Sequence, residues 1–473
     1  MTSSAVTTLT VNEENEKDVI SSRPNDNSGE AVEDTKEEGQ DPTDESTKLE
    51  RWNYPRINMY RYLTTLLCFI NMGMNDAAYG ALIPYLEVYY NVNYTIISLV
   101  FLAPFLGYTL AAFLNNTVHM RFGQLGIAII GPSCKIIAYV VICIHPPYPV
   151  LPVIFMFAGF GIGLADSGWN AWIGNMQNAN EMLGILHGCY GLGAAISPLI
   201  ATAMVTKAHL VWYKFYYLMV GVAVLELVLS IVTFRRATGA IYRAKNPGTH
   251  SEEGHSRTRE ALRNKITWLC AIFLLLYVGV EVSLGGWLVT FMLKVRHGEP
   301  FASGLVVTGF WLGLTFGRVI LGFVTGKIGE KLAIAGYLLI CMGLELCFWL
   351  IPNFVASAVF AGWLGFFLGP LFPAAIVVAT KLLPRRLHIS SIGFAAAFGG
   401  GGAAVLPFAV GAIAQAKGVQ VLQPIALALF VAILAFWCLL PGGFKKRGLE
   451  EVQRQRDEEA NCGADDEGGG LSA

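Results

Sequence analysis

The chain has 473 residues, of which 54% are hydrophobic and 14% are charged, and its formal net charge is −1. Soluble domains carry roughly 25% charged residues, so the composition excludes an ordinary soluble protein. The near-zero net charge gives no sign of a nucleic-acid partner. The nine cysteines include no CxxC pair and no Cys/His cluster, so we expect no metal, no cofactor and no disulfide framework.

The first fifty residues are acidic, polar and free of aromatic side chains. Such a segment cannot bury enough apolar surface to fold, so residues 1–55 are expected to be a disordered acidic tail. The tail lacks a basic stretch followed by an apolar one, and therefore does not resemble a secretory signal peptide. A regulatory or sorting role and a merely solvated tail both remain open.

Twelve apolar runs of about twenty residues or more follow, each long enough to cross hydrocarbon roughly 30 Å thick. The expected spans are 59–85, 95–118, 125–144, 150–175, 184–206, 211–234, 266–293, 302–326, 332–351, 354–383, 389–415 and 421–440. We therefore predict an all-α membrane protein. Its expected parts are a six-helix half (56–235), a linker (236–265), a second six-helix half (266–441) and a C-terminal tail (442–473).

Lysine and arginine concentrate in the loops on one side of these spans, including Arg51, Arg121, Lys327 and the basic linker 236–265. Cytoplasmic loops are the ones enriched in these residues, so both termini and the linker are predicted to be cytoplasmic. We expect a multi-pass protein of the plasma membrane, with the vacuole or another endomembrane as the alternative. The lipid bilayer is then a partner of the chain.

An internal repeat divides the spans into two halves. The segment LVFLAPFLGYTLAAFLNNTVHMRFG from Leu99 matches LVVTGFWLGLTFGRVILGFVTGKIG from Leu305 without a gap, at an offset of 206 residues. A second match sets GLGAAISP from Gly191 beside GGGAAVLP from Gly400. Two parallel six-helix repeats joined by a long cytoplasmic segment resemble a major facilitator-type transporter, with two pseudo-symmetric halves.

Ionisable residues inside the spans are few, and each is costly in hydrocarbon, so each is a candidate for function. Most of the charges in the spans are carboxylates, and the residues that stand out are Asp76, Asp166, Glu281, Glu226, Glu345, Lys135 and His187. Burial favours the neutral form of a carboxyl group, so such a group can load and release a proton as a cavity changes sides.

The expected position of each helix divides this set. In the major facilitator plan the first, fourth and seventh helices line the central cavity, so Asp76, Asp166 and Glu281 are predicted to couple transport to protons. Glu226 and Glu345 lie in peripheral helices and are expected to make structural hydrogen bonds in neutral form. Lys135 must find a partner: it either belongs to a structural ion pair or sets the charge of a nearby carboxylate. His187 is expected to contact solute, to carry a proton or only to pack between helices.

Three motifs resemble the fucose/galactose/glucose:proton symporter family. They are GIGLADSGWNAWIG in the fourth span, YVGVEVSLGGWLV in the seventh and FFLGPLFPA in the tenth. The resemblance implies that Asp166 stands at the family's acidic position and Asn170 at its asparagine, and that Asp76 matches the acid of the first helix. It also implies that His187 and Tyr190 stand where bacterial members present amide side chains.

The sequence departs from the family in several places. The loop signature Gly-x-x-x-Asp-Arg-x-Gly is reduced to NTVHMRFG and GFVTGKIG. Aspartate replaces glutamate in the fourth helix, and Trp169 and Trp172 stand next to it. The acidic tail and the cytoplasmic linker look like those of fungal members.

We therefore expect a monomeric, proton-coupled carrier of a small polar organic solute, with a sugar as one candidate, and no enzymatic activity. Solute is expected to bind Asn75, Trp169, Asn170, His187, Tyr190 and Trp287. An exporter of a drug or secondary metabolite that exchanges it for protons is the alternative. A non-transporting nutrient receptor is an alternative of another class. An enzyme is not supported, because the sequence shows no nucleophile–base set, phosphate loop or metal cluster.

Overall fold

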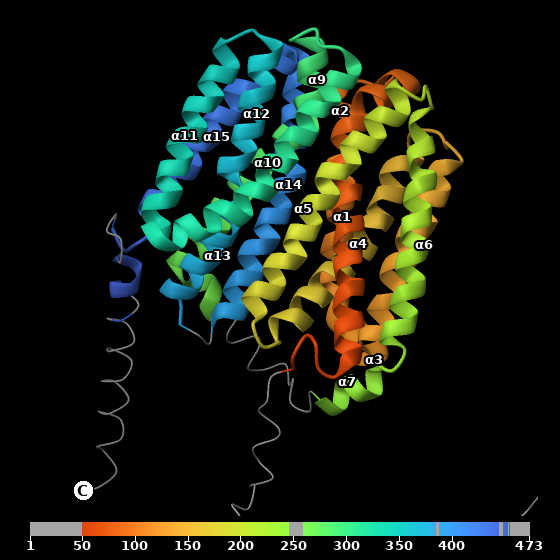
Figure 1. Ribbon diagram of the computed structural model, residues 1–473, viewed down its shortest axis with the longest axis vertical. Helices are drawn as coiled ribbons and strands as arrows, with labels where there is room; N and C mark the ends of the chain where they lie inside the picture. Colours follow the sequence, from red (N-terminus) through yellow and green to blue (C-terminus); the bar gives the residue numbers. More distant parts are fainter. Residues whose placement is uncertain (1–49, 246–258, 385–386, 444–447, 453, 455–473) are drawn as a thin grey trace, which may run out of the picture. The chain divides into compact units, whose positions relative to one another are not determined.

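The computed structural model describes residues 50–245, 259–384, 387–443, 448–452 and 454, and this part of the chain is helical without a β-strand. The elements are α1 (Arg56–Tyr90), α2 (Tyr94–Ile97), α3 (Leu99–Cys143), α4 (Val150–Gly174), α5 (Ala179–Thr206), η1 (Trp212–Lys214), α6 (Phe215–Phe234), α7 (Gly239–Lys245), α9 (Lys265–Lys294), α10 (Pro300–Ile328), α11 (Glu330–Leu350), α12 (Phe354–Leu368), α13 (Leu371–Leu382), α14 (His388–Lys417), η3 (Val419–Val421) and α15 (Leu422–Leu439) (Figure 1). Most of the predicted tails and the centre of the predicted linker lie outside the described residues.

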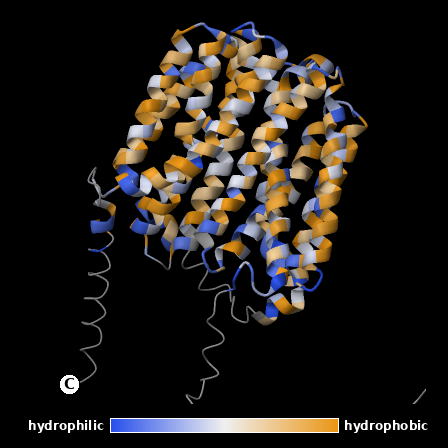
Figure 2. Ribbon diagram, in the orientation of Figure 1, coloured by the Kyte–Doolittle hydropathy of each residue, from blue (hydrophilic) through white to orange (hydrophobic). Residues whose placement is uncertain are grey.

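Eleven helices in the described residues are long and apolar enough to cross a membrane. One of them, Tyr94–Cys143, has 50 residues, about twice what a bilayer crossing needs at 1.5 Å per residue. This helix contains the second and third predicted spans, so the twelve-span fold is confirmed. Large apolar side chains such as Phe113 (78% exposed) and Phe323 (75% exposed) point outward, and Figure 2 shows hydrophobic residues along the lengths of the helices, as lipid contact requires.

The second and third predicted spans are two helical segments that meet within α3, as predicted. They are separated by a sharp kink at Gly123, whose φ of 70° is readily adopted only by glycine. An added Cβ at Gly123 would lie 2.5 Å from the backbone oxygen of Ala237, just before α7. The backbone N–H of Leu125 donates a 3.0 Å hydrogen bond to that same oxygen. The segment between α6 and α7 therefore stabilises the kink.

Close glycine contacts repeat between the two halves, which confirms the pseudo-symmetry. An added Cβ at Gly107 of α3 would lie 1.9 Å from the carbonyl oxygen of Met156 on α4. One at Gly313 of α10 would lie 2.1 Å from that of Gly362 on α12. Both members of the second pair stand 206 residues after those of the first. The reverse contacts repeat in the same way, with Gly159 against Pro104 and Gly365 against Phe310.

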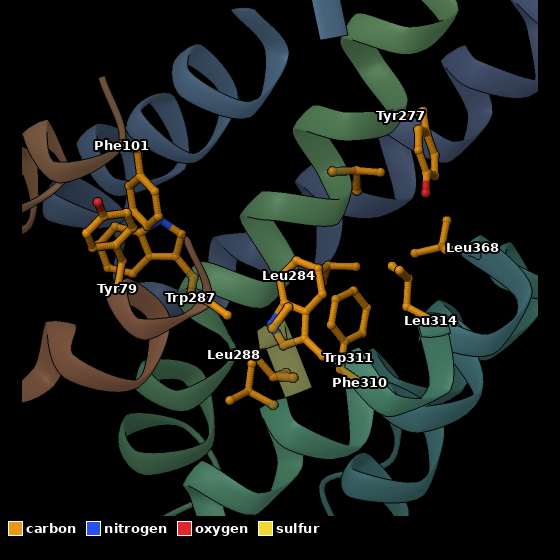
Figure 3. Packing of buried hydrophobic residues seen from close by; sticks show 14 of the residues in the cluster. Tyr79, Phe101, Tyr277, Leu284, Trp287, Leu288, Phe310, Trp311, Leu314 and Leu368 are labelled. Atoms are coloured by element: carbon orange, nitrogen blue, oxygen red, sulfur yellow. The ribbon is translucent and has the colours of Figure 1, made fainter. Parts of the chain in front are cut away.

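The two halves meet on the side of the molecule where α1 ends, called here the far side; the near side is where α1 begins. At the far side an added Cβ at Gly80 of α1 would lie 2.1 Å from the carbonyl oxygen of Gly285 on α9. The backbone N–H of Tyr94 donates a 2.9 Å hydrogen bond to Gln415 of α14. In the same region Trp287 packs beside Phe101 and Tyr79 (Figure 3). The far side is therefore closed in this structure.

Candidate functional site

Two carboxyl groups of the first half, Asp76 on α1 and Asp166 on α4, lie close enough to interact electrostatically. Both are only partly buried. Asp76 accepts hydrogen bonds from the amide of Asn75 (3.0 Å) and from the hydroxyl of Tyr190 on α5 (2.8 Å). Asp166 accepts a 2.9 Å hydrogen bond from the amide of Asn170, one helical turn further along α4. Neutral donors thus hold both carboxyl groups.

The polar set extends to His187 on α5. The Nε2 atom of His187 lies 3.1 Å from the amide oxygen of Asn170, so Asp166, Asn170 and His187 form a hydrogen-bonded series across α4 and α5. The ring of Phe69 meets the imidazole edge-on at a centroid distance of 5.6 Å. The structure therefore brings together six of the predicted residues: Asn75, Asp76, Asp166, Asn170, His187 and Tyr190.

The second half contributes an ion pair that faces this set. A carboxylate oxygen of Glu281 on α9 accepts a 3.1 Å hydrogen bond from the guanidinium of Arg318 on α10. The side chains of Glu281 and Arg318 are 6% and 17% exposed. Tyr190 interacts electrostatically with both members of the pair, and His187 does so with Arg318. Arg318 was not among the residues predicted from the sequence, although a lone arginine in an apolar run is the same signal that identified the carboxylates.

The two tryptophans predicted to stack on solute are both buried, and each is held by other contacts. Trp169 is 3% exposed and stacks on Phe234 of α6 at 4.6 Å between ring centroids. Trp287 is fully buried at the far side, where its indole N–H donates a 2.9 Å hydrogen bond to the carbonyl oxygen of Pro407. In this conformation neither ring offers a face to a solute.

The expectation for Glu226 was wrong in its charge state. Its two carboxylate oxygens lie 2.7 and 2.6 Å from the ammonium of Lys135, and both side chains are fully buried, so Glu226 belongs to an ion pair. Lys135 thereby finds the structural partner that the sequence required. Glu345 is fully buried, but neither of its oxygens has a hydrogen-bond partner among the described residues, contrary to the predicted hydrogen bonds. Among the residues that the structure describes, no group of three or more His, Cys, Asp or Glu side chains is arranged to hold a metal ion.

The fold defines a polytopic membrane protein, and the family match identifies it as a transporter. Residues 65–363 match the Major Facilitator Superfamily, and the chain belongs to that family. A transporter family is not an enzyme family, so the prediction that the chain is not an enzyme is confirmed by this membership.

Similar proteins agree with the motif resemblance. The chain is 30% identical to "Bypass of stop codon protein 6" of Saccharomyces cerevisiae over 86% of this chain and 87% of that protein. It is 21% identical to "Glucose/mannose transporter GlcP" of Bacillus subtilis over 74% of this chain and 87% of that protein.

Solved structures show the same fold. A bacterial homologue of the human lysosomal transporter Spinster, in an inward-facing and unoccupied conformation, gives a TM-score of 0.69 at 12% identity over 84% of this chain and 98% of that one. The Major Facilitator Superfamily transporter FucP, in the outward conformation, gives 0.58 at 14% identity over 80% of this chain and 97% of that one.

Proposed function

We propose that the protein is a secondary active carrier that moves a small polar organic solute together with protons, by alternating access. One observation carries the proposal. Asp76 and Asp166 interact with each other while neutral side chains hold them, next to a tyrosine that also interacts with the Glu281–Arg318 pair of the opposite half. The proposed proton sites therefore lie beside a tyrosine of the first half that interacts with charged groups of the second half.

The two carboxyl groups provide the proton chemistry of the proposal. Two carboxylates within interaction range resist ionising together, so binding of a proton at one changes the affinity of the other. A proton taken up on a carboxyl oxygen of Asp76 or Asp166 from one side would be released to the other side after the halves rock. Glu281 is already paired with Arg318, which favours an orienting role for this carboxylate over proton exchange.

The side chains proposed to contact solute are hydrogen-bonding groups that match hydroxyl groups. Asn170 and His187 line one side of the site, Tyr190 lies between the halves, and Arg318 presents from the second half a guanidinium whose Nε has no hydrogen-bond partner among the described residues. A sugar is therefore the first cargo to test, and the similarity to a glucose/mannose transporter supports that choice.

The access cycle follows from the contacts between the halves. The structure is closed at the far side, where Gly80 meets Gly285. If the near side is cytoplasmic, as the lysine and arginine pattern predicts, solute leaves this conformation toward the cytoplasm. We retain the plasma membrane and the monomeric state as proposals. A fluorescent fusion in cells and the mass of the purified protein in detergent test them.

The test is a cargo screen in proteoliposomes that hold a pH-sensitive dye. Hexoses, polyols and sugar acids are added outside under an imposed pH gradient, and solute and proton fluxes are recorded together. Proton movement in the same direction as solute supports the proposal. Opposite movement shows that the protein is an antiporter. Binding without any flux across the whole panel would indicate the receptor alternative and overturn the carrier.

A further inference from the structure

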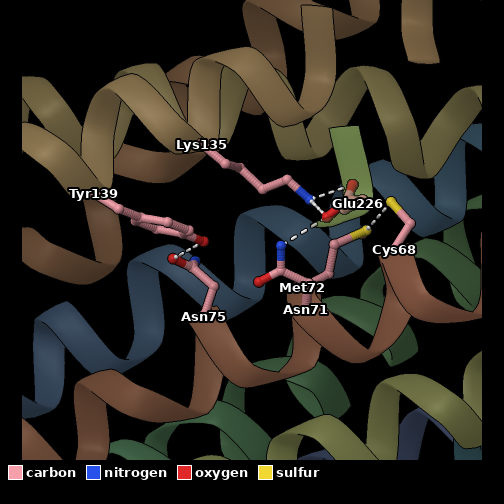
Figure 4. A network of polar contacts seen from close by, with 7 residues as sticks. All are labelled: Cys68, Asn71, Met72, Asn75, Lys135, Tyr139 and Glu226. Atoms are coloured by element: carbon pink, nitrogen blue, oxygen red, sulfur yellow. Dashed lines mark hydrogen bonds and ion pairs between the residues drawn. The ribbon is translucent and has the colours of Figure 1, made fainter. Parts of the chain in front are cut away.

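A fully buried ion pair lies next to the proposed proton site and is not among the side chains proposed to contact solute. Lys135 of α3 binds both carboxylate oxygens of Glu226 on α6, at 2.7 and 2.6 Å. The amide of Asn71 on α1 donates a 2.6 Å hydrogen bond to the same carboxylate. All three side chains are 0% exposed, so the pair ties three helices of the first half together (Figure 4).

A second set of contacts lies one helical turn away and reaches Asp76. Tyr139 of α3 donates a 3.1 Å hydrogen bond to the amide oxygen of Asn75, whose amide nitrogen donates at 3.0 Å to Asp76. Tyr139 follows Lys135 by four residues, and Asn75 follows Asn71 by four, so each pair occupies one face of its helix. The second set therefore joins α1 to α3 directly, and the first set joins them through Glu226 of α6.

These two sets of contacts connect the geometry of the ion pair to the proton site. Buried charges are tolerated only when they are paired and hydrogen-bonded in good geometry, so Lys135 and Glu226 resist any rotation of α1 that removes Asn71. The rotation of α1 that keeps Asn71 at the ion pair also keeps Asn75 beside Tyr139. The Tyr139 hydroxyl then binds the amide oxygen of Asn75, so the amide nitrogen of Asn75 faces Asp76. Lys135 also interacts electrostatically with Asp76.

Several other ionisable groups surround Asp76, and a change at the ion pair must be judged against them. They are Tyr79 on α1, Tyr108, Lys135 and Tyr139 on α3, Asp166 on α4 and Tyr190 on α5. Lys135 is the one cation of this set in the first half. Its position, buried and locked to Glu226, is therefore a fixed element of the field at Asp76.

We propose that the Lys135–Glu226 pair is a positioning device for Asp76. Acting through Asn71 and Asn75, the pair holds α1 in the rotation in which Asp76 exchanges its proton, and it sets the pH at which that exchange is half complete. The pair touches neither solute nor the transferred proton. This proposal rests on the proposed function, because it takes Asp76 as a proton site.

The experiment reads Asp76 directly and needs no known cargo. The protein is purified into lipid nanodiscs, and the infrared band of protonated carboxyl groups is titrated with pH. Every protein compared carries Asp166→Asn, because Asp166 would otherwise titrate together with Asp76. Subtracting the spectrum of the variant that also carries Asp76→Asn then isolates the signal of Asp76. The double variant Lys135→Met/Glu226→Gln removes both charges together and keeps an oxygen for Asn71, so no unpaired charge remains buried.

In the double variant the midpoint of the Asp76 titration is expected to move by about one pH unit, a tenfold change in proton affinity. Tyr139→Phe, which removes only the hydroxyl that binds Asn75, is expected to move it by a smaller amount. This second variant decides the matter if the double variant does not fold. Glu345→Gln is the matched control, since it removes a fully buried carboxyl in the second half and should leave the midpoint unchanged.

The outcomes separate the two proposals. A clear Asp76 titration that neither the double variant nor Tyr139→Phe moves would overturn the positioning role while leaving the proton site intact. A difference spectrum without any titrating band would instead remove Asp76 from the proposed function, and the positioning role with it.

Discussion

The guanidinium of Arg318 on α10 lies 3.1 Å from a carboxylate oxygen of Glu281 on α9, and the two side chains are 17% and 6% exposed. An ion pair at this depth is stable only while both members are present, because removing one leaves the other as a buried, uncompensated charge. The relationship joins two helices of the second half, and Tyr190 of the first half interacts with both charges. It therefore predicts how substitutions of the pair will combine.

Arg318→Met is expected to destabilise the protein by about 3–5 kcal/mol, because it leaves the carboxylate of Glu281 buried without a counter-charge. It is also expected to abolish transport. The double variant Arg318→Met/Glu281→Gln should recover most of the thermal stability but not transport, since the guanidinium proposed to contact solute is still missing. Thermal unfolding of the purified variants and uptake into proteoliposomes measure the two effects. Transport at the parental rate by either variant would exclude Arg318 from the site.

The contact between Gly80 and Gly285 predicts a conformational variant. A Cβ at Gly80 would lie 2.1 Å from the Gly285 carbonyl oxygen, so Gly80→Val is expected to force the far side open. Spin labels placed at the exposed Val88, near the end of α1, and Lys417, at the end of α14, should then move apart, as measured by pulsed electron resonance. Gly221→Val is the matched control, because an added Cβ there meets nothing within 4 Å. Unchanged label distances in Gly80→Val would show that this contact does not hold the far side shut.

The repeated packing predicts that equivalent glycines have equivalent costs. Gly107→Val and Gly313→Val each place a side chain against the backbone of the next packed helix, so each should destabilise its half by about 1–3 kcal/mol or more. Gly322→Val, at a position with open space, should change stability little. Thermal unfolding of the three variants tests this. A large cost at one of the repeated positions and none at the other would contradict equivalent packing.

The lysine and arginine pattern predicts that both termini are cytoplasmic. Tags at the two ends should be protected from protease in intact cells and become accessible after the membrane is permeabilised. A tag that is cleaved in intact cells would reverse the orientation, and with it the side toward which this conformation releases solute.

Much of the fold was predictable because bilayer thickness fixes the length of each span and the repeat aligns the halves. The sharp kink at Gly123 between the two segments of α3 was not, since it depends on a backbone contact with Ala237, far away in sequence. Within the site, spacing of four residues placed Asp166 and Asn170 on one face. Spacing could not show that Trp169, one residue earlier, turns toward Phe234, because that depends on which neighbour covers that face.

The same limit explains the ion pairs. Glu226 and Lys135 are 91 residues apart, and the sequence marks each as costly without naming its partner. Pairing is a property of tertiary packing, so the predicted neutral form of Glu226 was wrong although its structural role was anticipated. Arg318 carried the same signal as the acids, a charge within an apolar run, and the structure supplies its partner Glu281.

The central claim, that these carboxyl groups couple solute to protons, is tested most directly with Asp166→Asn. This change keeps the shape and hydrogen-bonding capacity of the side chain and removes the titrating group, so it mimics the protonated state permanently. In proteoliposomes the variant is compared with the parent for solute exchange at equal concentrations and for accumulation driven by a pH gradient. The account predicts that exchange persists while accumulation and the accompanying proton flux are lost. Accumulation equal to that of the parent would contradict it.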